Sequence, residues 1–592
     1  MKIKILLGAL ACSALLASCS DQMNYREDTG GKYNKEDIEK IFDRVTGFVT
    51  NVYASVDCGF DEYGAAFESS ATDESDYSVA GNSIETFFNG SWSPSKSMNT
   101  MWTQMYTGIS AANLYLDQFS EGLTFPEHEL DDNYSKEIFQ YKNRFPYEVR
   151  FLRAYFYFNL VRQYGAVPFY TKDIQPEEVN NLERTPAKDI FKFIDEECAA
   201  IADKLPSQWS EDNGVGVANE NLRATRLAVL ALRARAALYA ASPLFNTEND
   251  ASLWRTAALR NKEVIDACLK EGFKLPADYN SIWAADNTTI APGHEMIFVR
   301  PTMYSAGNYG RRLEQRNFPV GITGAGAGGN CPTQSLVEAY DVAADGSELD
   351  WNDPNEAMKS IDKLDPRFAK TVARNGDVWP FYNAARLETY ENGASGLPAI
   401  GATTTGYYLK KLLDNKKVID LRPGKNTTAV HSWVVFRLGE FYLNYAEAVF
   451  RMTGGADVAP NGDGFTSGYL KTAREAVNET RTRAGVAGLP TNLTSDQFWH
   501  KYERERMVEL AFEGHRFWDV RRWKEGDKFS GKNIYVMHIT KNNDGTFNYE
   551  RQTLADTRID WNDKMYFFPI PVDEMLKHEQ YGVKWNQNTG WE

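Results

Sequence analysis

The 592-residue chain has few cysteines and histidines, and neither residue type forms a recognisable metal or redox motif. Outside the leader, the cysteines are scattered without a CxxC pair, so we expect buried free thiols rather than a zinc ribbon or a disulfide framework. The 7 histidines include no HExxH or HxH pattern, which disfavours a histidine-based metal hydrolase. No GxSxG nucleophile elbow occurs either.

Positive charge and long apolar runs are also in short supply. The net charge is -16, which repels phosphate backbones and disfavours nucleic-acid binding. Beyond the leader, no apolar run approaches the roughly 20 residues that span a bilayer, so we expect a soluble body. The 81 acidic residues offer too many carboxylate pairs to identify a glycoside hydrolase from sequence.

The first 18 residues have the pattern of a bacterial lipoprotein signal peptide. A basic start at 1–4 precedes an apolar run at 5–16, too short to span a membrane. Leu16-Ala17-Ser18-Cys19 then resembles a lipobox, which predicts cleavage before Cys19 and lipidation of its sulfur. The alternative is ordinary signal cleavage beside a chance cysteine. Residues 19–35 are polar and predict a flexible tether.

Helical periodicity dominates the rest of the chain. Helices are predicted at 36–56, 101–119, 147–164, 187–205, 223–241, 254–271, 433–452, 469–484 and 495–510. Leu438-Gly439, Tyr442, Ala446 and Phe450 match part of the tetratricopeptide pattern, although Val435 replaces its tryptophan. The predicted fold is therefore mainly α, with tetratricopeptide-like helix pairs. A plain helical bundle would give the same periodicity.

The helical signal fails between residues 274 and 424. This region is rich in Gly, Pro, Asn, Asp and Tyr, with short strand-like pieces at 296–299 and 407–412. Long irregular segments in compact proteins often form binding surfaces. We therefore predict three parts: an N-terminal helical part at 36–273, a loop-rich ligand-binding lobe at 274–424 and a C-terminal helical part at 425–592.

Two partial motifs in the lobe do not predict a cofactor. Gly324, Gly326 and Gly329 satisfy GxGxxG, but no clear strand precedes them, so a mobile loop is favoured over a dinucleotide site. The segment 341–352 imitates a calcium loop at Asp341, Asp345 and Gly346, but it fails at the third position, Ala343, and at the twelfth, where Asn352 replaces the closing glutamate. No cofactor is expected, and calcium remains an unsupported alternative.

The segment 503–523 is dense in charges and aromatic residues. It could form a charged ligand site. We favour a structural network, because buried charges need partners and this segment supplies both signs beneath its Trp and Phe residues.

This segment closely resembles the signature of the SusD/RagB family of outer-membrane lipoproteins. Other pieces resemble the family in the same order along the chain: 150–157 with the turn at 164–168, 224–244, 437–448, 567–571 and 587–591. Thr589 stands where many members have proline. With the lipobox, the resemblance covers essentially the whole chain.

The resemblance implies four tetratricopeptide-like helix pairs that support a loop-rich face. It also implies a non-enzymatic protein, lipid-anchored on the exterior of the outer membrane. Such a protein would capture a glycan for a SusC-like TonB-dependent transporter. Peptide binding in the manner of RagB is the first alternative, and a surface glycoside hydrolase is the second.

Site residues carry over from starch-binding members, whose contacts come from the stretch before the first long helix and from the loop-rich lobe. The matching positions here are Asp73, Trp92 and Asn99, followed by Tyr304 and Tyr309. For each aromatic residue, packing in the core is an equal alternative to stacking on a sugar.

Overall fold

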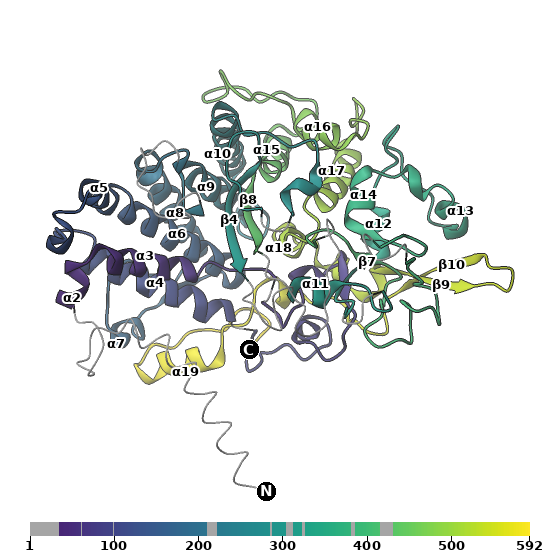
Figure 1. Cartoon of the computed structure of the whole chain (residues 1–592), viewed down its shortest axis with the longest axis horizontal. Helices are drawn as coiled ribbons and strands as arrows, with labels where there is room; N and C mark the ends of the chain where they lie inside the picture. Colours follow the sequence, from purple (N-terminus) through teal and green to yellow (C-terminus); the bar gives the residue numbers. More distant parts are fainter. Residues whose placement is uncertain are drawn as a thin grey trace, which may run out of the picture.

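The structure is a computed structural model that describes residues 35–60, 62–98, 100–209, 222–284, 287–303, 312–322, 326–379, 385–414 and 430–592. It is mainly helical, and its described strands form only two-stranded sheets. Figure 1 shows an elongated molecule with helices at one end and loops at the other. Over the described residues, every helix is too short or too polar to cross a membrane.

A series of helices packed side by side forms the scaffold. They are α2 (Lys35–Lys40), α3 (Phe42–Ala54), α4 (Thr100–Gln118), α5 (Tyr134–Asn143), α6 (Phe145–Tyr164), α8 (Ala187–Ile201), α9 (Arg226–Ala241), α10 (Ala251–Lys270), α15 (Leu438–Thr453) and α16 (Ala473–Ala484). From α3 onward, α5 aside, each packs on the next, as in a tetratricopeptide array. Local signals set their ends: Thr472 and Glu475 form a capping box for α16, and Gly454 ends α15 in a left-handed conformation.

The predicted helices at 433–452 and 469–484 both begin too early, the second because α16 starts only at Ala473. Residues 433–437 belong to β8 (Val430–Arg437), which pairs antiparallel with β4 (Met296–Met303), and α15 begins only at Leu438. The run of Val434, Val435 and Phe436 is β-branched and aromatic, which suits a buried strand. Its apolar spacing also continues the period of the helix, so the sequence pattern merged the two elements.

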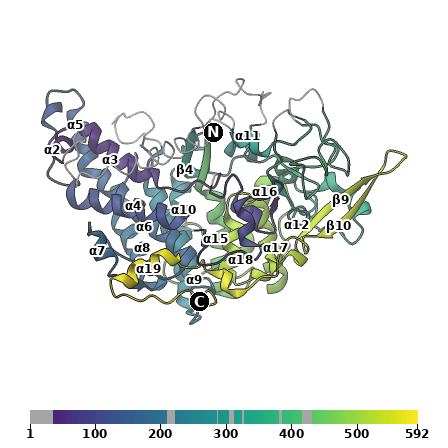
Figure 2. The same ribbon diagram turned by 90° about the horizontal axis from the view of Figure 1, so that it is seen from below.

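The loop-rich end carries short helices and strand pairs. They include α11 (Arg312–Asn317), α12 (Gln334–Glu338), α13 (Pro354–Met358), α14 (Pro366–Thr371), β1 (Ser75–Tyr77) with β5 (Asn330–Pro332), and β6 (Val372–Ala373) with β7 (Tyr408–Leu409). A hairpin of β9 (Tyr535–Lys541) and β10 (Phe547–Thr553) projects from this end in both views (Figures 1 and 2). The hydrophobic core of this end also takes side chains from 60–67 and 507–539.

The predicted charge network is confirmed in the segment 503–523, which forms α17 (Ser495–Glu509) and α18 (His515–Trp523). Arg506 pairs with Asp519 at 2.6 Å. Arg522 donates to both oxygens of Glu447 on α15, at 2.6 and 2.7 Å. These groups are buried and paired with one another, so they join helices rather than face a ligand.

The C-terminal segment, residues 567–592, packs against the end of α6. Its own helix is α19 (Val572–Gln580). The backbone N–H of Phe568 donates to the carbonyl of Gln163 at 2.8 Å, and the amide of Asn588 donates to the carbonyl of Tyr164 at 3.0 Å. Phe568 and Trp591 are almost wholly buried. The two ends of the described chain therefore share one core.

Candidate functional site

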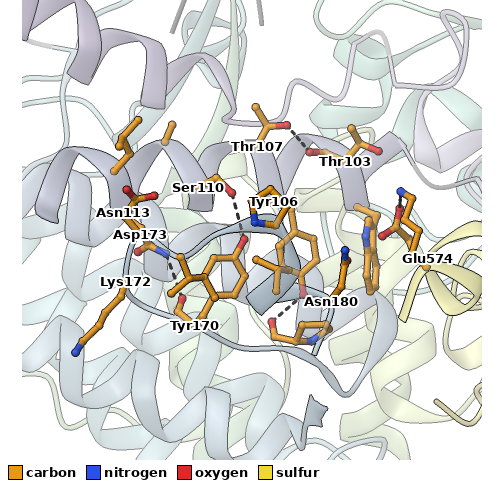
Figure 3. A pocket seen from close by; sticks show the side chains of 18 of the residues that line it. Thr103, Tyr106, Thr107, Ser110, Asn113, Tyr170, Lys172, Asp173, Asn180 and Glu574 are labelled. Carbon is orange, nitrogen blue, oxygen red and sulfur yellow. Dashed lines mark hydrogen bonds and ion pairs between the residues drawn. The ribbon is translucent and has the colours of Figure 1, made fainter. Parts of the chain in front are cut away.

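A pocket of about 580 Å³ opens between α4, the segment 168–180 and α19. This size is within the usual range for small-molecule sites. The segment 168–180 follows β2 (Val167–Pro168) and includes α7 (Pro176–Val179). Figure 3 shows the pocket with side chains from these elements around it.

Helical spacing brings the polar residues of α4 together on the pocket side. Tyr106 and Thr107 each lie three or four residues from both Thr103 and Ser110, and all four line the pocket. Met105 and Ile109 point into the core and are fully buried. The burial of that apolar face therefore fixes the polar face toward the pocket.

Tyr106 and Tyr170 form one wall of the pocket, and both lie near the middle of Figure 3. The rings of Tyr106 and Tyr170 are 4° from parallel, with centroids 6.3 Å apart. The Tyr106 hydroxyl donates to the carbonyl of Pro168 at 2.8 Å, and the hydroxyls of Ser110 and Tyr170 are 3.2 Å apart. These bonds hold both rings in place before any ligand arrives.

The tyrosine hydroxyls are neutral over the ordinary pH range. Burial raises the pKa of Tyr106 well above its usual value, with the neighbouring Tyr157 and Tyr170 adding to the effect. Burial also raises the pKa of Tyr170. The wall therefore presents uncharged hydroxyl groups and ring faces.

The opposite wall comes from α19. Glu574 and Lys577 form an ion pair at 2.6 Å, so their charges largely cancel. His578 lies against Trp585, with ring centroids 3.6 Å apart, and burial lowers its pKa, which keeps the imidazole neutral. Lys172 and Asp173 also line the pocket, so the site offers ring faces and hydroxyl groups together with charges of both signs. Within the described residues, no group of His, Cys, Asp and Glu side chains is arranged to hold a metal ion.

Two of the residues that the sequence proposed for the site, Asp73 and Trp92, do not line this pocket. Trp92 is 4% exposed and packs edge-on against Phe87, Phe568 and Trp591. This position favours the packing alternative over sugar stacking. Asn99, Tyr304 and Tyr309 lie outside the described residues.

Asp73 is 7% exposed, and Arg516 donates to both its oxygens at 2.9 and 2.7 Å. It also lines a separate, open basin of about 600 Å³ beside Glu525, Lys528 and Trp561. Asp73 and Trp92 are therefore not brought together in the pocket of Tyr106 and Tyr170.

The two partial motifs of the loop-rich lobe have structural roles where they are described. A side chain at Gly326 would lie 2.5 Å from the carbonyl oxygen of Phe318, so this glycine permits close backbone packing. Gly324 lies outside the described residues. In the segment that imitates a calcium loop, Asp341 pairs with Arg481 at 3.0 Å and with Lys501 at 3.1 Å. Protein cations thus neutralise the carboxylate that would begin a calcium loop.

The pocket residues Tyr106 and Tyr170 were missed from sequence. The available signal was the polar face of the helix at 101–119, whose Thr, Tyr and Ser residues repeat at helical spacing. Nothing in the sequence placed the loop at 168–180 or the helix at 572–580 beside that face.

Comparison with protein families gives two matches. Residues 294–591 match a sequence model described as the SusD family. Residues 23–238 match a second model, described as starch-binding and associating with the outer membrane.

Curated relatives and solved structures agree with these matches. SusD-like protein P2 of Formosa agariphila is 24% identical over 81% of this chain and 79% of its own length. The starch-binding protein SusD of Bacteroides thetaiotaomicron is 24% identical over 71% and 69%. A SusD-like protein from Bacteroides fragilis is similar in structure, with a TM-score of 0.74, 23% identity and coverage of 96% of this chain and 99% of its own. A laminarin-binding SusD-like protein has a TM-score of 0.62, 20% identity and coverage of 93% and 100%.

Proposed function

Because the chain belongs to the SusD family, we propose that it captures a glycan at the cell surface and delivers it to a SusC-like TonB-dependent transporter. Proteins of this family are non-catalytic binding proteins. The protein is accordingly a binding protein and not a glycoside hydrolase.

One observation carries the glycan part of the proposal: the fixed wall of Tyr106 and Tyr170 beside uncharged hydroxyl and amide groups. Sugars offer C–H faces to aromatic rings and hydroxyls to such polar groups. The names of relatives that bind starch or laminarin support the same ligand class. The sequence supports a location on the outer membrane, because a lipid attached to Cys19 in the lipobox would anchor the protein there.

The glycan proposal is tested by affinity gel electrophoresis and a glycan array with the purified protein lacking its leader, with product analysis of every binder. We expect retention by one class of polysaccharide without cleavage. Tyr170→Ala should weaken that binding by roughly three- to tenfold, the loss of one aromatic contact. Tyr581→Ala is the matched control, because Tyr581 is exposed and does not line the pocket.

Two outcomes would contradict this assignment. Retention that survives Tyr170→Ala in a folded protein would place the glycan outside this pocket. Binding of peptides and of no glycan would replace the proposed ligand class. Delivery is tested separately, by isolating the protein from outer membranes in mild detergent and asking whether a TonB-dependent barrel co-purifies.

A further inference from the structure

A short stretch of chain, residues 57–60 and 62–68, contributes to both hydrophobic cores of the molecule. Ala66 belongs to the core of the helical end, whereas Phe60 and Phe67 belong to the core of the loop-rich end. The stretch leads directly into β1, which pairs with β5 of the loop-rich end. We call it the junction segment, because it is built into the contact between the two ends.

Three carboxyl groups of the junction segment face one small cavity. They belong to Asp57, Glu62 and Glu68, and the cavity has a volume of about 30 Å³. A polar cavity of this size has room for about one water molecule. The rest of its wall comes from α6, α9, β8, α18 and the turn before α18. The three acids are thus held against long helices and a paired strand by an irregular piece of chain.

The cavity wall offers these acids one unpaired cation. This is Arg162 of α6, whose guanidinium lies 4.4 Å from the ring centroid of Trp518. Among the described residues, neither Arg162 nor any of the three acids has an ion-pair partner within 4 Å. The indole of Trp518 donates to Glu68 at 2.9 Å, which is a hydrogen bond without a balancing charge.

Two other charged groups of the wall are already paired. Arg235 of α9 donates to the Glu440 carboxylate at 2.7 Å. Glu513, in the turn before α18, pairs with Lys411 at 2.7 Å and with Arg437 at 2.7 Å. Neither group therefore changes the balance between Arg162 and the junction segment.

The remaining titratable groups around the cavity are neutral or turned to the backbone. Burial and the neighbouring arginines hold the pKa of His515 well below its usual value, so its imidazole is uncharged. Burial raises the pKa of Tyr155, which donates to Asp57, and raises that of Tyr239 to about 12. Arg521 is near Glu68 but does not line the cavity, and its guanidinium donates to two backbone carbonyls.

Three buried acids and one guanidinium cannot all be ionised at low cost in free energy. Burial accordingly raises the pKa of Glu68 to about 7, and burial with the charges of Glu68 and Asp57 raises the pKa of Glu62 well above its usual value. Because these folded pKa values exceed the ordinary ones, the packed arrangement is favoured at low pH and loses that preference as the pH rises through 7.

We propose that the junction segment is a proton-controlled latch between the helical and the loop-rich ends. While its carboxyl groups hold their protons, the segment stays packed on α6 and α18. When they ionise, the carboxylates repel one another across the cavity and draw the segment toward water. Glu62 is only half-buried, so a short movement brings it into solvent. This inference is independent of the proposed glycan pocket.

Hydrogen–deuterium exchange with mass spectrometry tests the latch on the purified protein without its leader, between pH 6 and pH 9. The rates are corrected for the effect of pH on chemical exchange. We expect the protection of peptides from residues 57–68 to fall above pH 7, by up to about tenfold per pH unit for each proton released on opening. Peptides from α10 should keep their protection, because the scaffold stays closed.

Two double variants separate titration of the latch from a general effect of charge. Glu62→Gln with Glu68→Gln keeps the size of both side chains and removes their ionisation, so protection of the junction segment should no longer depend on pH. Glu127→Gln with Glu129→Gln makes the same charge change at exposed positions and should behave as the wild type.

The wild-type profile decides the question even if the first double variant does not fold. Protection of residues 57–68 that is constant from pH 6 to pH 9 overturns the proposal. A parallel loss of protection in α10 also overturns it, because the whole protein would then be opening. So does a folded Glu62→Gln, Glu68→Gln protein that retains the pH dependence of the wild type.

Discussion

Trp92 shows how one side chain ties distant parts of the chain together. Its ring centroid lies 4.8 Å from that of Phe568 and 4.9 Å from that of Trp591, both in the C-terminal segment. Edge-to-face aromatic pairs of this kind add to the free energy gained from burial alone. These contacts make Trp92 part of the hydrophobic core.

We expect Trp92→Ala to lower the free energy of unfolding by about 3–5 kcal/mol, because it leaves a large cavity among aromatic rings. Urea unfolding followed by circular dichroism measures this loss. Trp92→Phe is the control and should cost less, since it keeps part of the ring contact. A stable Trp92→Ala protein with impaired glycan binding would show instead that the indole contacts ligand.

Glu68 is a buried residue whose carboxyl group lies against α18. The indole of Trp518 donates to it at 2.9 Å. Burial raises its pKa to about 7, against the opposing effects of Arg162 and of the Trp518 hydrogen bond, and Asp57 raises it further. Because the folded pKa exceeds the ordinary 4.5, the unfolded chain releases this proton more readily.

The stability that this group contributes is thus full below about pH 4.5 and is lost as the pH rises through 7. Glu68→Gln keeps an acceptor for Trp518 but cannot ionise. We expect its unfolding temperature to fall less than that of the wild type between pH 5 and pH 8, by on the order of a few degrees. Glu127→Gln, at an exposed position, is the control. Parallel curves for wild type and Glu68→Gln would mean that Glu68 does not titrate in this range.

The sequence left packing and sugar stacking open for Trp92, and it gave no sign of the arginine that pairs with Asp73. An isolated tryptophan in a polar stretch gives no sign of the partners at 568 and 591 that bury it. Asp73 likewise meets Arg516, 443 positions away. The local pattern carries residue type and spacing, whereas burial depends on contacts between distant segments.

Between elements, the Glu447 carboxylate joins α15 to α17 and α18. It accepts hydrogen bonds from Arg522, from the Trp523 indole at 2.8 Å and from the Tyr502 hydroxyl at 2.8 Å. Burial alone would favour the protonated form, but the Arg522 guanidinium holds the pKa of Glu447 at about 2. Glu447 is therefore ionised at ordinary pH.

Removing Glu447 alone should be costly, because it leaves a buried guanidinium without a partner. We expect Glu447→Ala to lower the free energy of unfolding by about 3–5 kcal/mol. The double variant Glu447→Leu with Arg522→Met should lose less than the sum of its single changes, as measured by urea unfolding. Additive losses would indicate that the two residues do not act as a pair.

Helices were the most predictable elements, since nearly every long apolar period became one. The exception at 433–437 arose because a buried strand and the following helix both present apolar residues at overlapping spacings. The β9–β10 hairpin and α19 gave weak signals, because they are short and largely polar. The residues of α4 and α19 gave no sign that these two helices would line one pocket.

At the scale of the whole molecule, the C-terminal segment closes the helical end. This segment is bonded to α6 and also to residues 182–184. The carbonyl of Asn586 accepts from Arg184 at 2.8 Å, and the Trp585 indole donates to the carbonyl of Leu182 at 3.1 Å. Through α19, the same segment also supplies one wall of the Tyr106–Tyr170 pocket. The C-terminal segment therefore contributes both to the core of the helical end and to the pocket.

Deletion of residues 567–592 should expose the aromatic core of the helical end. We expect the shortened protein to bind the dye ANS strongly and to lose cooperative thermal unfolding. Shortening the exposed turn of the β9–β10 hairpin at 542–546 removes chain without uncovering core and serves as the control. Cooperative unfolding of the 567–592 deletion would show that the helices form a self-sufficient unit.

The same closure has a consequence for the order of events after synthesis. The hydrogen bond between Asn588 and Tyr164 joins positions 424 residues apart, so early helices wait for a segment that leaves the ribosome much later. The leader at 1–18 predicts that the chain is threaded across a membrane, and a threaded chain must stay unfolded until it has passed. We expect a core that depends on residues 567–592 to fold late, which would keep the chain competent for translocation.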